Sequence, residues 1–212
     1  MVICVDLDEV CNDFVTVTLA LYNEDSGDSI TVDDVKDYQI AKAFKLEYRD
    51  KLFNYFNDPH FIEMLKWDVN WVVQIMRERK DDIYFLTATH PKNIYKKFAC
   101  LLKALIDAGY AIKDEELYRR LITTTNKQLI KTDILIDDCF DNLQFDEDVY
   151  NILVDKPWNR ALARKFNNTY LDRRRIIICD NVNDIPEIIE NIRKYKERGI
   201  GDGQLSCNNS KS

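Results

Sequence analysis

The stretch Val2-Ile3-Cys4-Val5-Asp6-Leu7-Asp8 decides the fold. Its apolar start predicts a strand that is covered on both faces, as in a parallel sheet, and acids follow where the strand ends. Alternate residues of an extended chain project the same way, so Asp6 and Asp8 can point into one cavity. For this pair alone, a solvated loop after a strand is the plain alternative.

Apolar runs of the same kind recur along the chain. They cover residues 83–87, 121–124, 134–136, 152–154 and 176–179. Between them, apolar residues spaced by three and four predict helices around residues 69–76, 98–105 and 182–192. Strands that alternate with helices indicate an α/β fold with a doubly wound parallel sheet, a Rossmann-type core with right-handed crossovers.

One long stretch breaks this alternation. About seventy-five residues separate Leu7 from Ile83, several times what one crossover helix requires. Helical patterns over 14–23, 32–44 and 48–56 predict a small helical cap inserted after the first strand. We expect the cap at 15–75, above the sheet edge where ligands of such folds bind. The core would be 1–14 and 76–198, and the polar end, 199–212, is predicted to be disordered.

The composition of the chain limits the kinds of partner that it is expected to bind. The chain has 212 residues, a formal net charge of −7 and six cysteines without a CxxC pair. No basic run exceeds Arg173-Arg174-Arg175, which disfavours a nucleic-acid duplex. The start lacks a signal-peptide pattern, and no apolar run reaches the roughly 18 residues of a membrane span. Together with cysteines that suit reduced thiols, these features predict a cytoplasmic protein without a membrane partner.

A second acid pair, Asp137-Asp138, closes the apolar run 134–136. Mg²⁺ prefers carboxylate oxygens and commonly takes one or two from the protein. Asp6 and Asp138, from neighbouring strands, could supply them. Taken alone, the second pair could equally be an N-cap for the following segment.

Two further strand ends carry complementary groups. The run 83–87 leads to Thr87-Ala88-Thr89, whose hydroxyl and N–H groups could hold phosphate oxygens. The run 121–124 leads to Lys127, whose ammonium could neutralise carboxylate and phosphate charge. Alone, Thr87 suits a turn and Lys127 a solvated surface. The order of acid, hydroxyl, lysine and paired acid makes the combination informative.

This order resembles the four motifs of the haloacid dehalogenase-like (HAD) phosphatase superfamily. Within it, the chain is most similar to the 5'(3')-deoxyribonucleotidases of the cytosolic type C class. The resemblance is carried by residues 5–14, 85–89, 127, 133–138 and 154–160. It implies Mg-dependent hydrolysis of nucleoside monophosphates, and it is compatible with a homodimer.

The resemblance also implies roles for individual residues. Asp6 would be the nucleophile that forms an aspartyl-phosphate, and Asp8 the general acid and base. Thr87, Ala88 and Lys127 would bind the phosphoryl group. Mg²⁺ would be held by Asp6, the main-chain carbonyl of Asp8, Asp138 and, directly or from the second shell, Asp137.

Two positions depart from the family pattern. Many relatives carry glycine where this chain has Glu9, and a carboxylate there would repel phosphate unless it turns away, towards the cap. Ala88 replaces the serine of some relatives, so one hydroxyl contact is missing. Neither change removes a catalytic group.

The candidates for binding the nucleoside are aromatic residues in the cap or next to it, because aromatic faces stack on any base. Phe14, Tyr38 and Phe61 are the candidates, and Tyr38 and Phe61 could equally be cap core. The three tryptophans are expected to serve packing.

Other functions use similar groups. The same machinery could act on a sugar phosphate or another small phosphoester, since pocket shape decides between substrates. A phospho-accepting receiver domain also clusters acids with a threonine and a lysine, but its acids precede those residues, whereas here the second pair comes last. A silent binding protein is disfavoured because every expected catalytic group is present.

Overall fold

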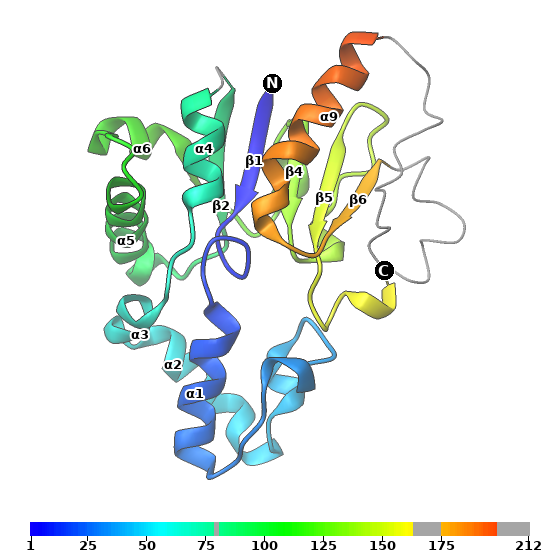
Figure 1. The fold of residues 1–212 in the computed structure, drawn as a ribbon. Helices are drawn as coiled ribbons and strands as arrows, with labels where there is room; N and C mark the ends of the chain where they lie inside the picture. The colour runs from blue at the N-terminus through cyan, green and yellow to red at the C-terminus, as the bar shows by residue number, and fades with distance from the viewer. Residues whose placement is uncertain (79–80, 163–174, 199–212) are drawn as a thin grey trace.

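Six parallel strands form one sheet in the computed structural model, which describes residues 1–78, 81–162 and 175–198. They are β1 (Val2–Asp6), β2 (Asp82–Thr87), β3 (Leu121–Thr123), β4 (Ile134–Asp137), β5 (Tyr150–Val154) and β6 (Ile176–Cys179). The spatial order is β3-β2-β1-β4-β5-β6 (Figure 1). Each strand lies where an apolar run predicted one.

The register brings the ends of the central strands together. β1 lies between β2 and β4, and Val5 pairs with Phe85 on one side and Ile136 on the other. One residue further along, Asp6 pairs with Leu86. The last residues of β1, β2 and β4, which are Asp6, Thr87 and Asp137, therefore reach the same edge of the sheet.

Helices flank this sheet and close its core. They are α4 (Asn70–Glu78), α5 (Ile94–Asp107), α6 (Asp114–Arg120) and α9 (Ile185–Arg198). One buried cluster joins Val5 and Ile83 of the strands to Trp71, Leu101 and Ile189 of the helices. The expected α/β architecture with a Rossmann-type parallel sheet is confirmed.

A second, wholly helical layer lies beyond the carboxyl ends of the strands (Figure 1). It contains α1 (Phe14–Ser26), α2 (Leu52–Asn57), α3 (Pro59–Met64) and the 3₁₀ turns Val32–Asp34, Ile40–Ala43 and Leu46–Lys51. This layer, the cap, has its own apolar clusters.

A continuous helix over 32–44 is wrong, because this segment forms two separate short turns. Polar side chains bind nearby backbone groups and so compete with a helix. Asp34 closes a capping box with Thr31, and the Asp37 carboxylate accepts a hydrogen bond from the Gln39 N–H at 2.9 Å.

The chain leaves and re-enters the core through one neck. Asn12 and Trp67 form an antiparallel bridge, the Asp68 N–H donates to the Cys11 carbonyl at 2.8 Å, and the Lys66 N–H donates to Asp13 Oδ1 at 2.7 Å. α4 follows the neck and packs in the sheet core. The geometry therefore favours a cap that ends near residue 66, earlier than the expected 75. The expected tail, 199–212, lies outside the described residues.

Within those described ranges, every helix is too short or too polar to cross a bilayer.

Candidate active site

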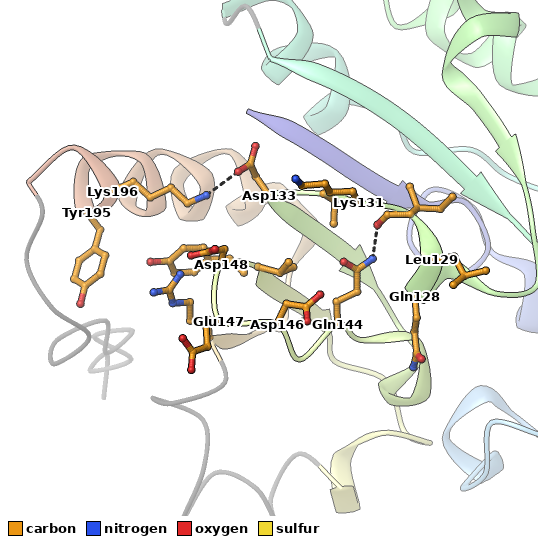
Figure 2. A pocket seen from close by; sticks show the side chains of 15 residues that line it. Gln128, Leu129, Lys131, Asp133, Gln144, Asp146, Glu147, Asp148, Tyr195 and Lys196 are labelled. Atoms are coloured by element: carbon orange, nitrogen blue, oxygen red, sulfur yellow. Dashed lines mark hydrogen bonds and ion pairs between the residues drawn. The ribbon is translucent and has the colours of Figure 1, made fainter.

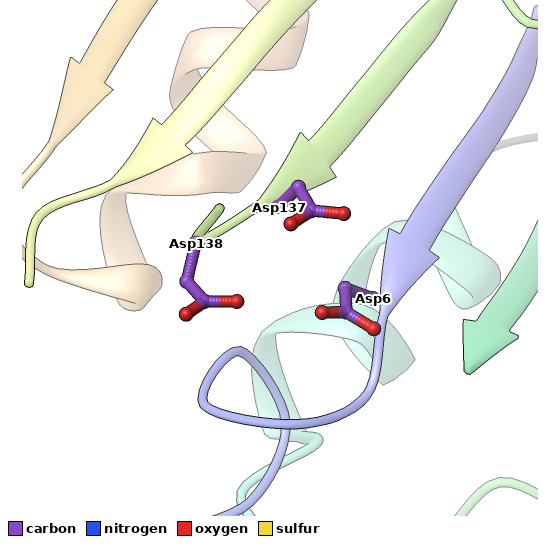
Figure 3. Close-up of side chains that lie close together, drawn as sticks. All are labelled: Asp6, Asp137 and Asp138. Atoms are coloured by element: carbon purple, nitrogen blue, oxygen red, sulfur yellow. The ribbon is translucent and has the colours of Figure 1, made fainter. Parts of the chain in front are cut away.

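Three carboxylates converge at the end of the central strands. Asp6 ends β1, Asp137 ends β4 and Asp138 follows directly, and one carboxylate oxygen from each residue lies within 4.8 Å of the other two (Figure 3). All three residues are buried. Because close anions repel one another, such a cluster requires shared protons or cations.

One cation is supplied by Lys127, at the start of the 3₁₀ turn Lys127–Leu129 after β3. Its Nζ lies 2.7 Å from Asp6 Oδ1 and 2.8 Å from Asp137 Oδ2. Asp137 also accepts hydrogen bonds from the Cys139 N–H and from Asn142 Nδ2. Asp137 is thus engaged in holding the lysine, which makes it a less available ligand than its neighbours.

The remaining oxygens suit a divalent ion. Asp6 Oδ1 also accepts from the Leu7 N–H, and Asp138 Oδ2 accepts from Trp158 Nε1 at 2.9 Å. Among the described residues, we find no hydrogen bond to Asp6 Oδ2 or Asp138 Oδ1. Carboxylate oxygens are the donors that hard cations prefer, so the residues present fit Mg²⁺.

The pKa shifts of the buried acids and of Lys127 also favour a bound cation. Burial raises the pKa of Asp6 to about 7; Lys127 opposes this shift, while Asp137 and Asp8 add to it. Burial and the charge of Asp137 also raise the pKa of Asp138 well above its ordinary value. Burial would lower the pKa of Lys127, but Asp6 and Asp137 hold it above its usual range. The acids therefore lack positive charge, which a bound cation would supply.

A second buried lysine connects Asp8 to Thr87. Lys97 Nζ, on α5, lies 2.6 Å from Asp8 Oδ2 and 2.8 Å from Thr87 Oγ1, and the residue is only 1% exposed. Sequence reasoning missed Lys97. Lys97, Leu101 and Leu105 follow one another at intervals of four residues, and this spacing is the signal that places the lysine on the buried face of the helix.

Glu9 turns its carboxylate towards the cap. It accepts a hydrogen bond from the Val15 N–H in the first turn of α1, and it lies 2.9 Å from Lys156 Nζ. Glu9 has φ 62°, a left-handed conformation that glycine adopts without strain. The Glu9 carboxylate is thus held by the Lys156 ammonium and by a main-chain N–H group at the start of α1.

The three nucleoside candidates differ in accessibility. Phe14 is half-buried, and its ring packs 4.8 Å from Phe56 and 5.1 Å from Phe61 between centroids. Phe61 is 1% exposed and so offers no free face to a base in this arrangement. Tyr38 is 55% exposed. Partial burial of its phenol, together with the charge of Asp138, raises the pKa of Tyr38.

Another hollow lies away from these residues. An open groove of about 1080 Å³ adjoins α9 at the amino ends of β4 and β5 (Figure 2). Asp133, Asp148 and Lys196 are among its lining residues, and Lys196 Nζ lies 3.0 Å from Asp133 Oδ1. None of the predicted site residues lines this groove.

Two comparisons with known proteins bear on the function of this site. The family model described as "5' nucleotidase, deoxy (Pyrimidine), cytosolic type C protein" matches residues 1–182. A 5'(3')-deoxyribonucleotidase of Clostridium acetobutylicum is 30% identical over 137 residues, which cover 63% of this chain and 71% of that protein.

Proposed function

The chain belongs to the family of cytosolic type C 5' nucleotidases, and from this premise we propose that it hydrolyses deoxyribonucleoside monophosphates through an aspartyl-phosphate on Asp6. It is a phosphoric monoester hydrolase of the 5'-nucleotidase type. The convergence of Asp6, Asp137 and Asp138 within 4.8 Å, beside Lys127, is the observation that carries the proposal.

In the first step, a carboxylate oxygen of Asp6 attacks phosphorus while the phosphorus–oxygen bond to the nucleoside breaks. Lys127 favours the ionised carboxylate of Asp6, because its Nζ lies 2.7 Å away. Asp8 gives its proton to the leaving alkoxide oxygen. Lys97 would hold Asp8 in place, and with Thr87 and Lys127 it would face the phosphoryl oxygens.

In the second step, water attacks the phosphorus of the aspartyl-phosphate. Asp8 takes a proton from that water, the bond between phosphorus and the Asp6 oxygen breaks, and inorganic phosphate leaves. The carboxylate of Asp6 is thereby regenerated. Two easier steps replace one difficult displacement.

Asp6 and Asp138 would hold Mg²⁺, with the main-chain carbonyl of Asp8 as a further ligand and Asp137 behind them. When bound, the ion neutralises charge on the phosphoryl oxygens. The oxygens without a protein hydrogen bond, Asp6 Oδ2 and Asp138 Oδ1, support this assignment.

The nucleoside would lie towards the cap, bordered by Phe14 and Tyr38. Phe61 would support Phe14 from behind, since it is buried against that ring. Ala88, the exposed residue directly after β2, would offer its main-chain N–H to phosphate.

A phosphate-release assay tests the proposal. The panel contains deoxyribo- and ribonucleoside monophosphates, with phosphate at the 5' or the 3' position, beside sugar phosphates. We expect release from deoxyribonucleotides in Mg²⁺ and none in excess EDTA. Asp6→Asn should lower turnover by a factor of about 10⁴ or more.

The matched control is Asp146→Asn, an exposed acid at the distant groove, which should leave turnover unchanged. Retained turnover in Asp6→Asn would reject the nucleophile, and activity in EDTA would reject the metal. A preference for sugar phosphates would reject the proposed substrate. A cytoplasmic location and a homodimer stay predictions of the sequence.

A further inference from the structure

Trp158 makes a polar contact that packing alone does not require. Its Nε1 donates to Asp138 Oδ2 at 2.9 Å, and both residues are buried. An indole N–H is a donor only and carries no lone pair for a metal. It can therefore hold one oxygen of Asp138 without competing for a cation at the other.

The ring of the same tryptophan belongs to the cap. Trp158 lies in an apolar cluster with Val15, Leu19 and Ile40, and all the other members of this cluster fall between residues 14 and 56. One side chain from the segment after β5 thus contacts the cap with its carbon atoms and Asp138 with its nitrogen.

The next residue fixes the main chain of Asp138. Asn159 Nδ2 donates to the carbonyls of Asp138 at 2.8 Å and Val154 at 2.7 Å, while its Oδ1 accepts from the Lys156 N–H. The backbone of Asp138 is therefore tied to the end of β5. These main-chain bonds do not fix the rotation of the Asp138 carboxylate. The indole N–H of Trp158 contacts this carboxylate directly.

We propose that Trp158 is a positioning residue that turns Asp138 Oδ1 towards Asp6 and makes this orientation depend on the cap. The inference rests on the proposed function, since it assumes that Asp138 binds the metal. Coupling between two sites is reciprocal, so binding of the cation and seating of the cap on Trp158 should favour each other.

Trp158→Phe tests the contact, because phenylalanine keeps an apolar ring but lacks the N–H. The matched control is Trp71→Phe. Trp71 is 2% exposed, and its Nε1 has no hydrogen-bond partner among the described residues. Mg²⁺ binding is measured by titration calorimetry without nucleotide, beside thermal unfolding in EDTA.

Loss of a group that orients a metal ligand typically costs 10- to 100-fold in affinity. We expect Mg²⁺ affinity to fall by about tenfold in Trp158→Phe and by less than about twofold in Trp71→Phe. Equal Mg²⁺ affinity in Trp158→Phe and the wild type would overturn the inference. Absence of Mg²⁺ binding by the wild type would instead overturn the metal in the proposed function.

A second pair of variants tests the dependence on the cap without touching Asp138 or its hydrogen bond. Leu19→Ala loosens the apolar cluster that contains the Trp158 ring, whereas Val17, on the same helix, lies in a different cap cluster. We expect Leu19→Ala to weaken Mg²⁺ binding severalfold and Val17→Ala to leave it unchanged. Equal effects of the two would refute the coupling, even if Trp158→Phe does not fold.

Discussion

Two buried ammonium groups bind three of the four acids of the site. Lys127 binds Asp6 and Asp137, and Lys97 binds Asp8. Asp138 has a neutral indole as its polar partner instead. When all four carboxylates are ionised, the two lysines leave an excess of two negative charges, which one divalent cation would balance.

Lys97 provides the residue-scale prediction. Lys97→Met removes the cation between Asp8 and Thr87 and keeps a side chain of similar length. We expect kcat/KM for phosphate release to fall about 100-fold, as when a donor to the transition state is lost. Lys103→Met, on the exposed face of the same helix, should leave kcat/KM within about twofold, because exposed ion pairs contribute little. Similar effects of both substitutions would contradict the role of Lys97.

The order of the strands predicts that the acids and Lys127 meet at one edge, but the sequence does not reveal two contacts of this site. Asp6, Thr87, Lys127 and Asp138 each follow an apolar run, so the topology alone brings them to one edge. Lys97 follows no such run; it lies on a helix whose buried face had been identified from leucines. Trp158 was assigned to packing, since a sequence does not show which acceptor an indole N–H will meet.

Secondary-structure elements also differ in how clearly the sequence predicts them. All six strands were predicted because β-branched apolar runs buried on both faces leave a clear pattern. The segment 32–44 was not, since side chains of Asp34 and Asp37 bind local backbone groups and end each helical turn. The short helices α3 and α6 were also missed; a stretch of six or seven residues spans too few turns to show a period.

Glu9 provides the prediction for an element, the start of α1. Asp13, at the N-cap, makes no side-chain capping bond, and Glu9 binds the Val15 N–H instead. Glu9→Ala should lower the free energy of unfolding by roughly 1–3 kcal/mol, through loss of the cap and of the pair with Lys156. Urea unfolding followed by circular dichroism measures this change.

Glu9→Gly separates the contacts from backbone strain. It loses the same side chain but relaxes φ 62°, so it should be more stable than Glu9→Ala by about 1 kcal/mol. Glu47→Ala, an exposed acid in the cap, should change stability by less than about 0.5 kcal/mol. Glu9→Ala as stable as the wild type would show that α1 does not depend on this carboxylate.

At the scale of the whole molecule, metal binding and folding are linked. An ion that binds only the folded chain stabilises it by about 2.7 kcal/mol at 100 times its Kd, which is roughly 5–10 °C in Tm for a protein of this size. The folded pKa of Asp6 is raised to about 7, and that of Asp138 is also raised, so protons compete with the ion below pH 7.

The sign of the pH dependence follows. A raised carboxyl pKa means that the metal-free folded state binds more protons than the unfolded chain, so its stability falls as pH rises from about 4 to 7. Bound Mg²⁺ would replace those protons. The gain in Tm on adding Mg²⁺, measured by calorimetry, should therefore be larger at pH 8 than at pH 6. The linkage would be contradicted if the gain in Tm were equal at pH 6 and pH 8. It would also be contradicted if Asp138→Asn gained as much in Tm from Mg²⁺ as the wild type does.

The neck between Cys11–Asp13 and Lys66–Asp68 has an evolutionary consequence. Because the two ends of the cap meet there, a foreign insert joined at the same points would close its own loop without stretching the sheet. Such a graft would need new partners for Glu9 and Trp158 only where these touch the cap. A different insert would thus fit this sheet only if it rebuilt the contacts that Glu9 and Trp158 make with the present cap.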